Sequence, residues 1–305
     1  MATVERSALR IDRPEIQQGM TPQHRVRPLM PAAMRGDFAA TDPFLALMED
    51  WFPRGVFGKH PHRGIETVTY VVEGRIDHYD NQGHEGTILP GDVQWMTAGR
   101  GLIHNEIPAE GVTVHSLQLW VNLPAADKMT APRYQDLAGD AVPVRRQPGV
   151  KIRVFSGASG GLTAPTKNIV PVTMVEIRLD QGASVRQDLP ADYNAVIVVL
   201  EGEGAIGADG KIVTAGDVAW LTRSDSGKTS EVAIRATDKP LRALLYAGRP
   251  LHEAVPCGTL RSYLGCPRIG YWPWGAGIPL VPTTIANPET FGLLISSSKV
   301  KVGKG

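Results

Sequence analysis

Hydrophobic and polar residues of this chain alternate over short segments that end at turns. Residues 66–72 are rich in β-branched and aromatic side chains and stop at the Glu-Gly pair 73–74, and residues 75–80 alternate polar with apolar positions. Alternation predicts β-strands, because successive side chains of a strand point to opposite faces of a sheet. Residues 93–97 follow the Pro-Gly-Asp turn 90–92, where proline presets φ and glycine accepts positive φ. Short strands at this spacing predict an antiparallel barrel or sandwich.

The second half of the chain repeats the pattern of the first. Residues 193–202 resemble residues 67–74, including the Glu-Gly ending, and residues 215–221 resemble residues 90–96. An internal repeat of this kind predicts that one barrel has been duplicated. The length of 305 residues agrees with two domains, because it exceeds the usual size of one.

These observations predict an all-β fold of two tandem antiparallel β-barrels. We place the junction at the end of a polar, turn-rich stretch, so that residues 1–147 form the N-terminal barrel and residues 148–255 the C-terminal barrel. Residues 256–305 differ in character, with many prolines and clustered aromatic residues, and we treat them as an atypical tail.

Two pairs of metal-capable side chains are the strongest chemical signal in the sequence. His60 and His62 are separated by one residue, and so are His104 and Glu106. Residues i and i+2 of a strand share a face, so two neighbouring strands would aim three imidazoles and one carboxylate at a common point. This donor set suits a divalent iron, manganese, nickel, copper or zinc ion. It leaves coordination positions free, unlike structural zinc sites, and therefore predicts a reactive centre in the N-terminal barrel.

The remaining histidines carry weaker signals. A lone histidine on a strand is more often a hydrogen-bonded structural residue than a ligand. We interpret His78, His84 and His115 as surface residues or as partners that orient the ligands. Glu66 is expected as a buried neighbour of the site. No histidine lies between His115 and His252, so the C-terminal barrel is predicted to be metal-free.

The residues around both pairs resemble the cupin superfamily, and more specifically its pirin family. The cupin motifs are matched by glycines, histidines, a glutamate and a proline at the expected spacing, namely Gly55, His60, His62, Glu66 and Gly74 in the first motif and Gly86, Pro90, Gly91 and His104 in the second. The longer strings HPHRGIETVTYVVEG and PGDVQWMTAGRGLIHNE are similar to pirins, and the resemblance runs from about Ala8 to about Val255. It implies a bicupin with one mononuclear iron-type site.

The pirin resemblance also implies a ligand set and an activity. The ligands would be His60, His62, His104 and Glu106, and the ion Fe(II), although the same donors accept Mn, Ni, Co, Cu or Zn. The implied activity is that of quercetin 2,3-dioxygenase, which cleaves a flavonol with dioxygen, with Glu106 as the catalytic residue that takes the proton of the 3-hydroxyl group.

The walls of a flavonol cavity are less well defined. A planar substrate would need a partly apolar cavity. Its candidate walls are four residues that we interpret first as barrel core and only second as pocket wall: Trp95, Met96, Leu117 and Leu119.

Two other functions remain open at this point. The alternative to the dioxygenase is an iron-binding regulatory protein that modulates transcription or metabolism through contacts with a protein partner, because the resemblance includes family members of this kind. A metal-binding barrel with an unrelated small substrate is a further alternative, because the cupin framework carries many reactions. The residues alone do not decide whether the chain is an enzyme.

Composition narrows the setting of the protein. The formal net charge is +1, from 32 basic and 31 acidic residues, so no strong field favours direct binding to nucleic acid or to anionic lipid. No apolar run is long enough to span a bilayer, and no secretory leader is recognised. The two cysteines, Cys257 and Cys266, suggest no disulfide framework. We therefore expect a cytoplasmic protein without membrane association.

Overall fold

The computed structural model of this chain describes residues 3–30, 38–225 and 229–253. The atypical tail predicted for residues 256–305, with Cys257 and Cys266, lies outside the described residues. The rest belongs to one compact unit, Met1–Val255. In the described part strands dominate, and the one helix is a 3-10 turn, η1 (Ala125–Asp127). None of the described helical segments is long and apolar enough to cross a membrane.

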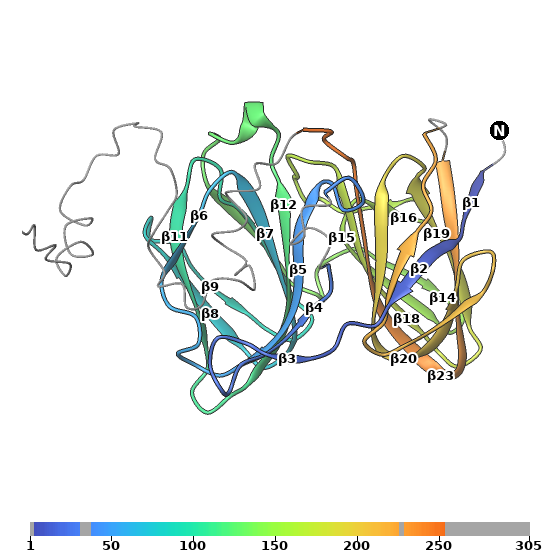
Figure 1. The fold of residues 1–305 in the computed structure, drawn as a ribbon, viewed down its shortest axis with the longest axis horizontal. Helices are drawn as coiled ribbons and strands as arrows, with labels where there is room; N and C mark the ends of the chain where they lie inside the picture. The colour runs from blue at the N-terminus through green and yellow to red at the C-terminus, as the bar shows by residue number, and fades with distance from the viewer. Residues whose placement is uncertain (1–2, 31–37, 226–228, 254–305) are drawn as a thin grey trace, which may run out of the picture. The chain divides into compact units, whose positions relative to one another are not determined.

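The first half forms two β-sheets that enclose one interior (Figure 1). The larger sheet has, in spatial order, the strands β13 (Arg133–Leu137), β10 (Val93–Thr97), β7 (Ile65–Glu73), β12 (Val114–Asn122), β5 (Phe44–Phe52), β4 (Arg25–Pro28) and β3 (Gln17–Gln18). The smaller sheet has the order β6 (His60–His62), β11 (Leu102–Pro108), β8 (Ile76–Asp80) and β9 (Glu85–Ile88). Hydrogen bonds from Thr69 and Gln118 of the larger sheet to Glu106 of the smaller one cross the interior.

The second half is built on one large curved sheet. Its main path is β14 (Val144–Gln147), β15 (Val150–Ser156), β18 (Val172–Leu179), β23 (Thr229–Gly248), β20 (Asn194–Ile206), β22 (Val218–Leu221) and β2 (Ala8–Asp12). Further strands pair with β23 and β20, namely β1 (Val4–Arg6), β19 (Ser184–Pro190) and β21 (Lys211–Thr214), and a hairpin of β16 (Ala158–Ser159) and β17 (Leu162–Thr163) lies apart from this sheet. Strands β1, β2 and β14 precede the predicted junction at residue 147 and still pair with second-half strands. The domain limits stay a prediction.

The internal repeat is visible in the strand pairing. In the first half β7 lies between β10 and β12, and in the second half β20 lies between β22 and β23. The Glu-Gly ending has a physical reason, because Gly74 and Gly202 have φ of +87° and +82°, a region that other residues rarely adopt. A Cβ at Gly202 would also lie 1.7 Å from the carbonyl oxygen of Pro240. The predicted all-β fold with a duplicated strand pattern is confirmed.

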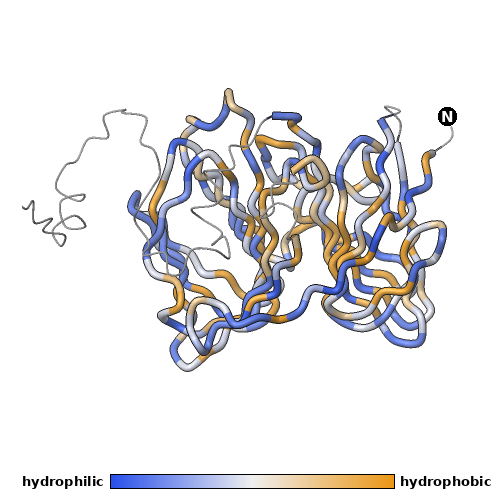
Figure 2. Tube along the Cα trace, viewed as in Figure 1, coloured by the Kyte–Doolittle hydropathy of each residue, from blue (hydrophilic) through white to orange (hydrophobic). Residues whose placement is uncertain are grey.

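The two halves fill their interiors differently. The second half contains a continuous core of buried aliphatic residues, including Ile152, Ile177, Ile197 and Val232. A further apolar core lies where the larger sheet of the first half packs on the second half, and the hydropathy colouring shows hydrophobic positions gathered there (Figure 2). The first interior instead holds buried polar side chains, which form the candidate site.

Candidate metal centre

The short strand β6 and its partner β11 place three histidines together. The strands are antiparallel, with His104 opposite His60 and Leu102 opposite His62. His60 and His62 are buried on one face while Pro61 between them is exposed. Proline is tolerated here because β6 is the edge strand of its sheet. The predicted juxtaposition of the two histidine-bearing segments on adjacent strands is therefore confirmed.

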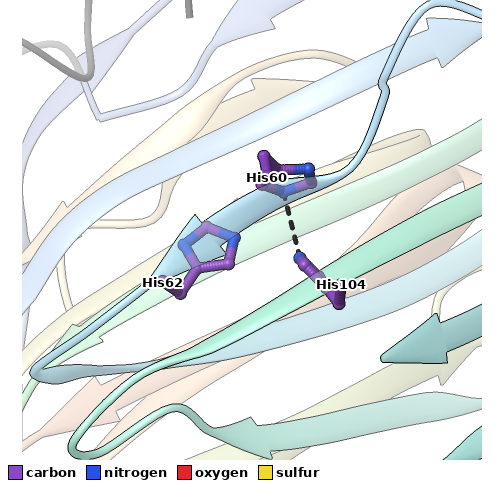
Figure 3. Close-up of side chains that lie close together, drawn as sticks. All are labelled: His60, His62 and His104. Atoms are coloured by element: carbon purple, nitrogen blue, oxygen red, sulfur yellow. Dashed lines mark hydrogen bonds between the residues drawn. The ribbon is translucent and has the colours of Figure 1, made fainter. Parts of the chain in front are cut away.

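The imidazole nitrogens of His60, His62 and His104 converge on one point (Figure 3). One potential ligand atom from each of them lies within 4.8 Å of the other two, and Nε2 of His60 is 3.0 Å from Nε2 of His104. Nδ1 of His60 lies 2.8 Å from the carbonyl oxygen of Gly58 and must carry the hydrogen of that bond, because a carbonyl only accepts. The hydrogen-free nitrogen of the neutral His60 ring is thus Nε2, which lies beside Nε2 of His104.

His62 gives the most direct test of whether a metal ion fits. Its side chain is buried, and both ring nitrogens lack a hydrogen-bond partner among the described residues. A buried polar atom without a partner costs about 1–3 kcal/mol. An ion at the centre would give one of these nitrogens a partner. Three neutral imidazoles also form a donor set that first-row metals bind, so the residues fit such an ion.

Burial keeps His62 and His104 of the three-histidine cluster in the neutral form that binds metals. Burial lowers the pKa of His104 to about 2, with the neighbouring His60 and His78 as further causes. Burial likewise lowers the pKa of His62 well below its ordinary value, assisted by His60 and His104. Both imidazoles are therefore neutral near neutral pH, and protons do not compete for their lone pairs.

Glu106 lies on β11, two residues beyond His104, and is also buried. Its carboxylate is not part of the group formed by the three histidines. Oε1 accepts a hydrogen bond from Oγ1 of Thr69 at 3.1 Å, and Oε2 accepts one from Nε2 of Gln118 at 3.1 Å. Its roles as fourth ligand and as catalytic base stay predictions.

Other histidines of the first half have separate surroundings. His78 is buried with Nε2 at 3.2 Å from Nδ1 of His104, which makes it a direct neighbour of the cluster. His84 stacks on Tyr134 with ring centroids 4.1 Å apart. His115 binds Glu49, its Nε2 lying 2.8 Å from Oε1, away from the three histidines. Of these three histidines, His78 is the one that contacts a predicted ligand, so the predicted orienting role applies to His78.

The larger sheet separates the site from most of the residues that the sequence suggested as neighbours, namely Glu66, Trp95, Leu117 and Leu119. Glu66 is buried, but its Oε1 accepts a hydrogen bond of 2.7 Å from Oγ1 of Thr97 rather than facing the histidines. Trp95, Leu117 and Leu119 belong to the apolar core between the halves, which confirms their interpretation as core. Met96 packs in a small separate cluster with Leu102, the residue opposite His62.

Three residues that no sequence motif indicated also contact the site, namely Thr69, Gln118 and Trp120. Nε1 of Trp120 donates to Oε1 of Gln118 at 3.0 Å, and the Trp120 ring lies 5.4 Å from that of His62 in an edge arrangement. A signal for two of them exists in the sequence of β12. Gln118 and Trp120 alternate with the core residues Leu117 and Leu119, so they must share the opposite, inward face.

Comparison with known proteins identifies the family. The family model described as Pirin matches residues 21–121, and the one described as Pirin C-terminal cupin domain matches residues 174–257. Pirin-like protein 2 of Arabidopsis thaliana is 42% identical over 226 residues, covering 72% of this chain and 70% of that protein. This chain belongs to the pirin family. The pirin resemblance of its sequence motifs is confirmed, and its two barrels are the two cupin domains of a bicupin.

Solved structures agree with this assignment. The crystal structure of GK1651 from Geobacillus kaustophilus is 51% identical, with a TM-score of 0.80, and covers 83% of this pirin-family chain and 100% of its own. A quercetin 2,3-dioxygenase from Acinetobacter baumannii is 29% identical, with a TM-score of 0.73, and covers 83% of this chain and 90% of its own. The fold therefore extends over nearly the whole described part of the chain.

Proposed function

We propose that this pirin-family protein holds one metal ion at His60, His62 and His104, with Glu106 as the carboxylate partner, and cleaves flavonols with dioxygen. The observation that carries the proposal is the buried His62, whose two ring nitrogens have no partner among the described residues although two other imidazoles face it. Such an arrangement is costly as a structural feature and suited to an ion. Fe(II) is the ion we propose first, with Mn, Ni, Co, Cu and Zn as alternatives.

The ion would supply Lewis acidity, which lowers the pKa of a coordinated hydroxyl group, together with free positions for substrate and dioxygen. The protein supplies the base. Glu106 is buried and accepts hydrogen bonds from Thr69 and Gln118, which hold its carboxylate group in place. That group would take the proton of the flavonol 3-hydroxyl group. The expected products are a depside and carbon monoxide.

Two features of this chain support a planar aromatic substrate. Trp120 lies beside His62 and is half-buried, so its ring offers an apolar wall next to the three histidines. The second feature is the similarity, at 29% identity, to a quercetin 2,3-dioxygenase from Acinetobacter baumannii. Both favour a flavonol over a substrate of unrelated shape.

The test is a turnover assay with quercetin. Protein stripped with a chelator and reloaded separately with each of the six metals is mixed with quercetin in air, and the loss of flavonol absorbance is followed. We expect turnover with iron, and loss of both bound metal and turnover in His62→Ala. His115→Ala is the matched control, because His115 binds Glu49 rather than the cluster, and it should retain both.

The same assay separates the enzymatic from the regulatory function. Full metal occupancy without turnover of several flavonols would contradict the dioxygenase proposal. It would favour the alternative that the metal-loaded barrel acts through contacts with a protein partner. Failure of the wild-type protein to bind any of the metals would contradict both.

A further inference from the structure

We infer that Gln118, held in one amide orientation by Trp120, is the positioning residue for Glu106, and that Trp120 couples this carboxylate to His62. This inference rests on the proposed function, since it concerns how the chain arranges two of the proposed ligands. It assigns a role to two residues that carry no metal-binding side chain. Neither of them is singled out by the histidine pattern of the sequence.

The orientation of the Gln118 amide follows from the chemistry of its neighbours. The indole nitrogen of Trp120 is a donor only, and it lies 3.0 Å from Oε1 of Gln118. That oxygen must therefore accept, which turns the NH₂ group toward Glu106. Nε2 of Gln118 then donates to both carboxylate oxygens, at 3.3 Å to Oε1 and 3.1 Å to Oε2. An amide turned the other way would oppose an oxygen to a carboxylate.

These bonds join the two sheets of the first barrel. Gln118 lies on β12 and is paired in register with Thr69 of β7, so both donors come from the larger sheet. Glu106 lies on β11 of the smaller sheet, the strand that also carries His104. The hydroxyl group of Thr69 donates a further hydrogen bond to Oε1 of Glu106. A flexible glutamate side chain is thereby tied at both oxygens to groups on another sheet.

Trp120 extends the same chain of contacts to His62. The two rings meet edge to face, with centroids 5.4 Å apart and planes at 77°. His62 has no hydrogen bond to orient its ring among the described residues, so ring contacts with Trp120, His60 and His104 must do so. One tryptophan therefore contacts His62 directly and Glu106 through Gln118. Partners of this kind commonly change metal affinity 10- to 100-fold when they are replaced.

The experiment measures binding of cobalt(II), whose visible spectrum reports its coordination, to the chelator-stripped full chain. Trp120→Phe keeps an aromatic ring beside His62 and removes the N–H together with the five-membered ring of the indole. Gln118→Met keeps the length of the side chain and removes both polar groups. We expect each to weaken cobalt(II) binding about 10-fold and to alter the spectrum in the same way as Glu106→Gln. The double variant should be no weaker than Gln118→Met alone, because Trp120 acts on Glu106 through Gln118.

Trp220→Phe is the matched control. Nε1 of Trp220 donates to Oδ2 of Asp12 at 2.8 Å in the second half, so this variant loses the same type of bond away from the histidines. It should leave cobalt(II) affinity and spectrum unchanged. Thermal unfolding of every variant shows whether it is folded.

Several outcomes would overturn the inference while leaving the metal centre intact. They are a wild-type spectrum and affinity in Trp120→Phe, losses that multiply in the double variant, and unchanged cobalt(II) binding in Glu106→Gln. A wild-type protein that binds no cobalt(II) would instead remove the proposed metal centre and this inference together. The two failures are therefore distinguishable.

Discussion

At the scale of single residues, the hydrogen bonds of His104 determine which of its ring nitrogens can bind an ion. If His104 offers Nε2 to an ion, its Nδ1 carries the hydrogen and needs an acceptor. Nε2 of His78 lies 3.2 Å from that Nδ1 and is the acceptor in this arrangement. Burial lowers the pKa of His78, so its imidazole is neutral and has a lone pair to offer. His78 thus selects the tautomer of His104.

We predict that His78→Phe weakens metal binding about 10-fold, because Nδ1 of His104 loses its acceptor. Competition with a chromophoric chelator for zinc measures this change. His115→Phe provides the control, since it removes a first-half imidazole bound to Glu49 and should leave the affinity as it is. Equal zinc affinities of His78→Phe and wild-type protein would contradict the role of His78 as the acceptor for His104.

At the scale of elements, the N-terminal strand β1 is anchored by an arginine. Arg6 is only 1% exposed, and its guanidinium donates to Oγ of Ser230 and to the carbonyl oxygens of Pro190, Ala191 and Tyr193. Burial lowers the pKa of Arg6 to about 10, which still leaves it charged at neutral pH. The bonds tie β1 to β23, with which it pairs in parallel, and to the turn after β19. The start of the chain thereby becomes part of the second-half sheet.

We predict that Arg6→Met lowers the free energy of unfolding by about 3–5 kcal/mol, since several buried acceptors lose their donor at once. Urea denaturation measures the loss, and amide hydrogen exchange at residues 230–232 should rise with it. Arg10→Met is the control on the neighbouring strand. Arg10 is partly exposed and pairs with Asp12, so its loss should cost less than about 1 kcal/mol. Comparable losses in both variants would contradict the anchoring role.

At the scale of the molecule, the two halves share a buried ionic cluster as well as an apolar core. Glu176 of β18 is 1% exposed and accepts hydrogen bonds from Tyr70 of β7 and from Arg153, Arg178 and Arg242. Burial alone would raise the pKa of Glu176, but Arg153 and Arg178 outweigh it and hold the pKa at about 2. Because Tyr70 comes from the first half, the cluster crosses the contact between the halves.

We predict that Glu176→Gln destabilises the protein by about 3–5 kcal/mol, because it leaves buried guanidinium groups without their carboxylate. The folded-state pKa lies below the ordinary value of 4.5, so this stabilisation is present above pH 4.5 and is lost as the pH falls toward about 2. Urea denaturation across this range should show a smaller loss of stability for Glu176→Gln than for wild-type protein. Glu201→Gln is the control, because Glu201 is a largely exposed partner of Arg242. Its substitution should lower the free energy of unfolding by less than about 1 kcal/mol.

Strand patterns and turn residues are local properties, so much of the fold follows from them. The predicted strand 93–97 coincides with β10, and the positive φ of Gly74 and Gly202 explains the repeated Glu-Gly endings. The pairing of β1 with β23 has no local signal, because it joins residues more than 200 positions apart. Its anchor, Arg6, has the sequence context of an ordinary surface charge.

The candidate site likewise combines features that follow from local sequence with features that depend on tertiary packing. The spacing of His60 and His62 was enough to predict that they share a face, because the alternation of a strand is a property of the backbone. Their meeting with His104 also requires the pairing of β6 with β11. Which neighbours complete the site depends on how two sheets face each other. Because of that packing, the Glu106 carboxylate accepts hydrogen bonds from Thr69 and Gln118, whereas the Glu66 carboxylate accepts one from Thr97. Such contacts form between distant strands, so only the tertiary structure could decide them.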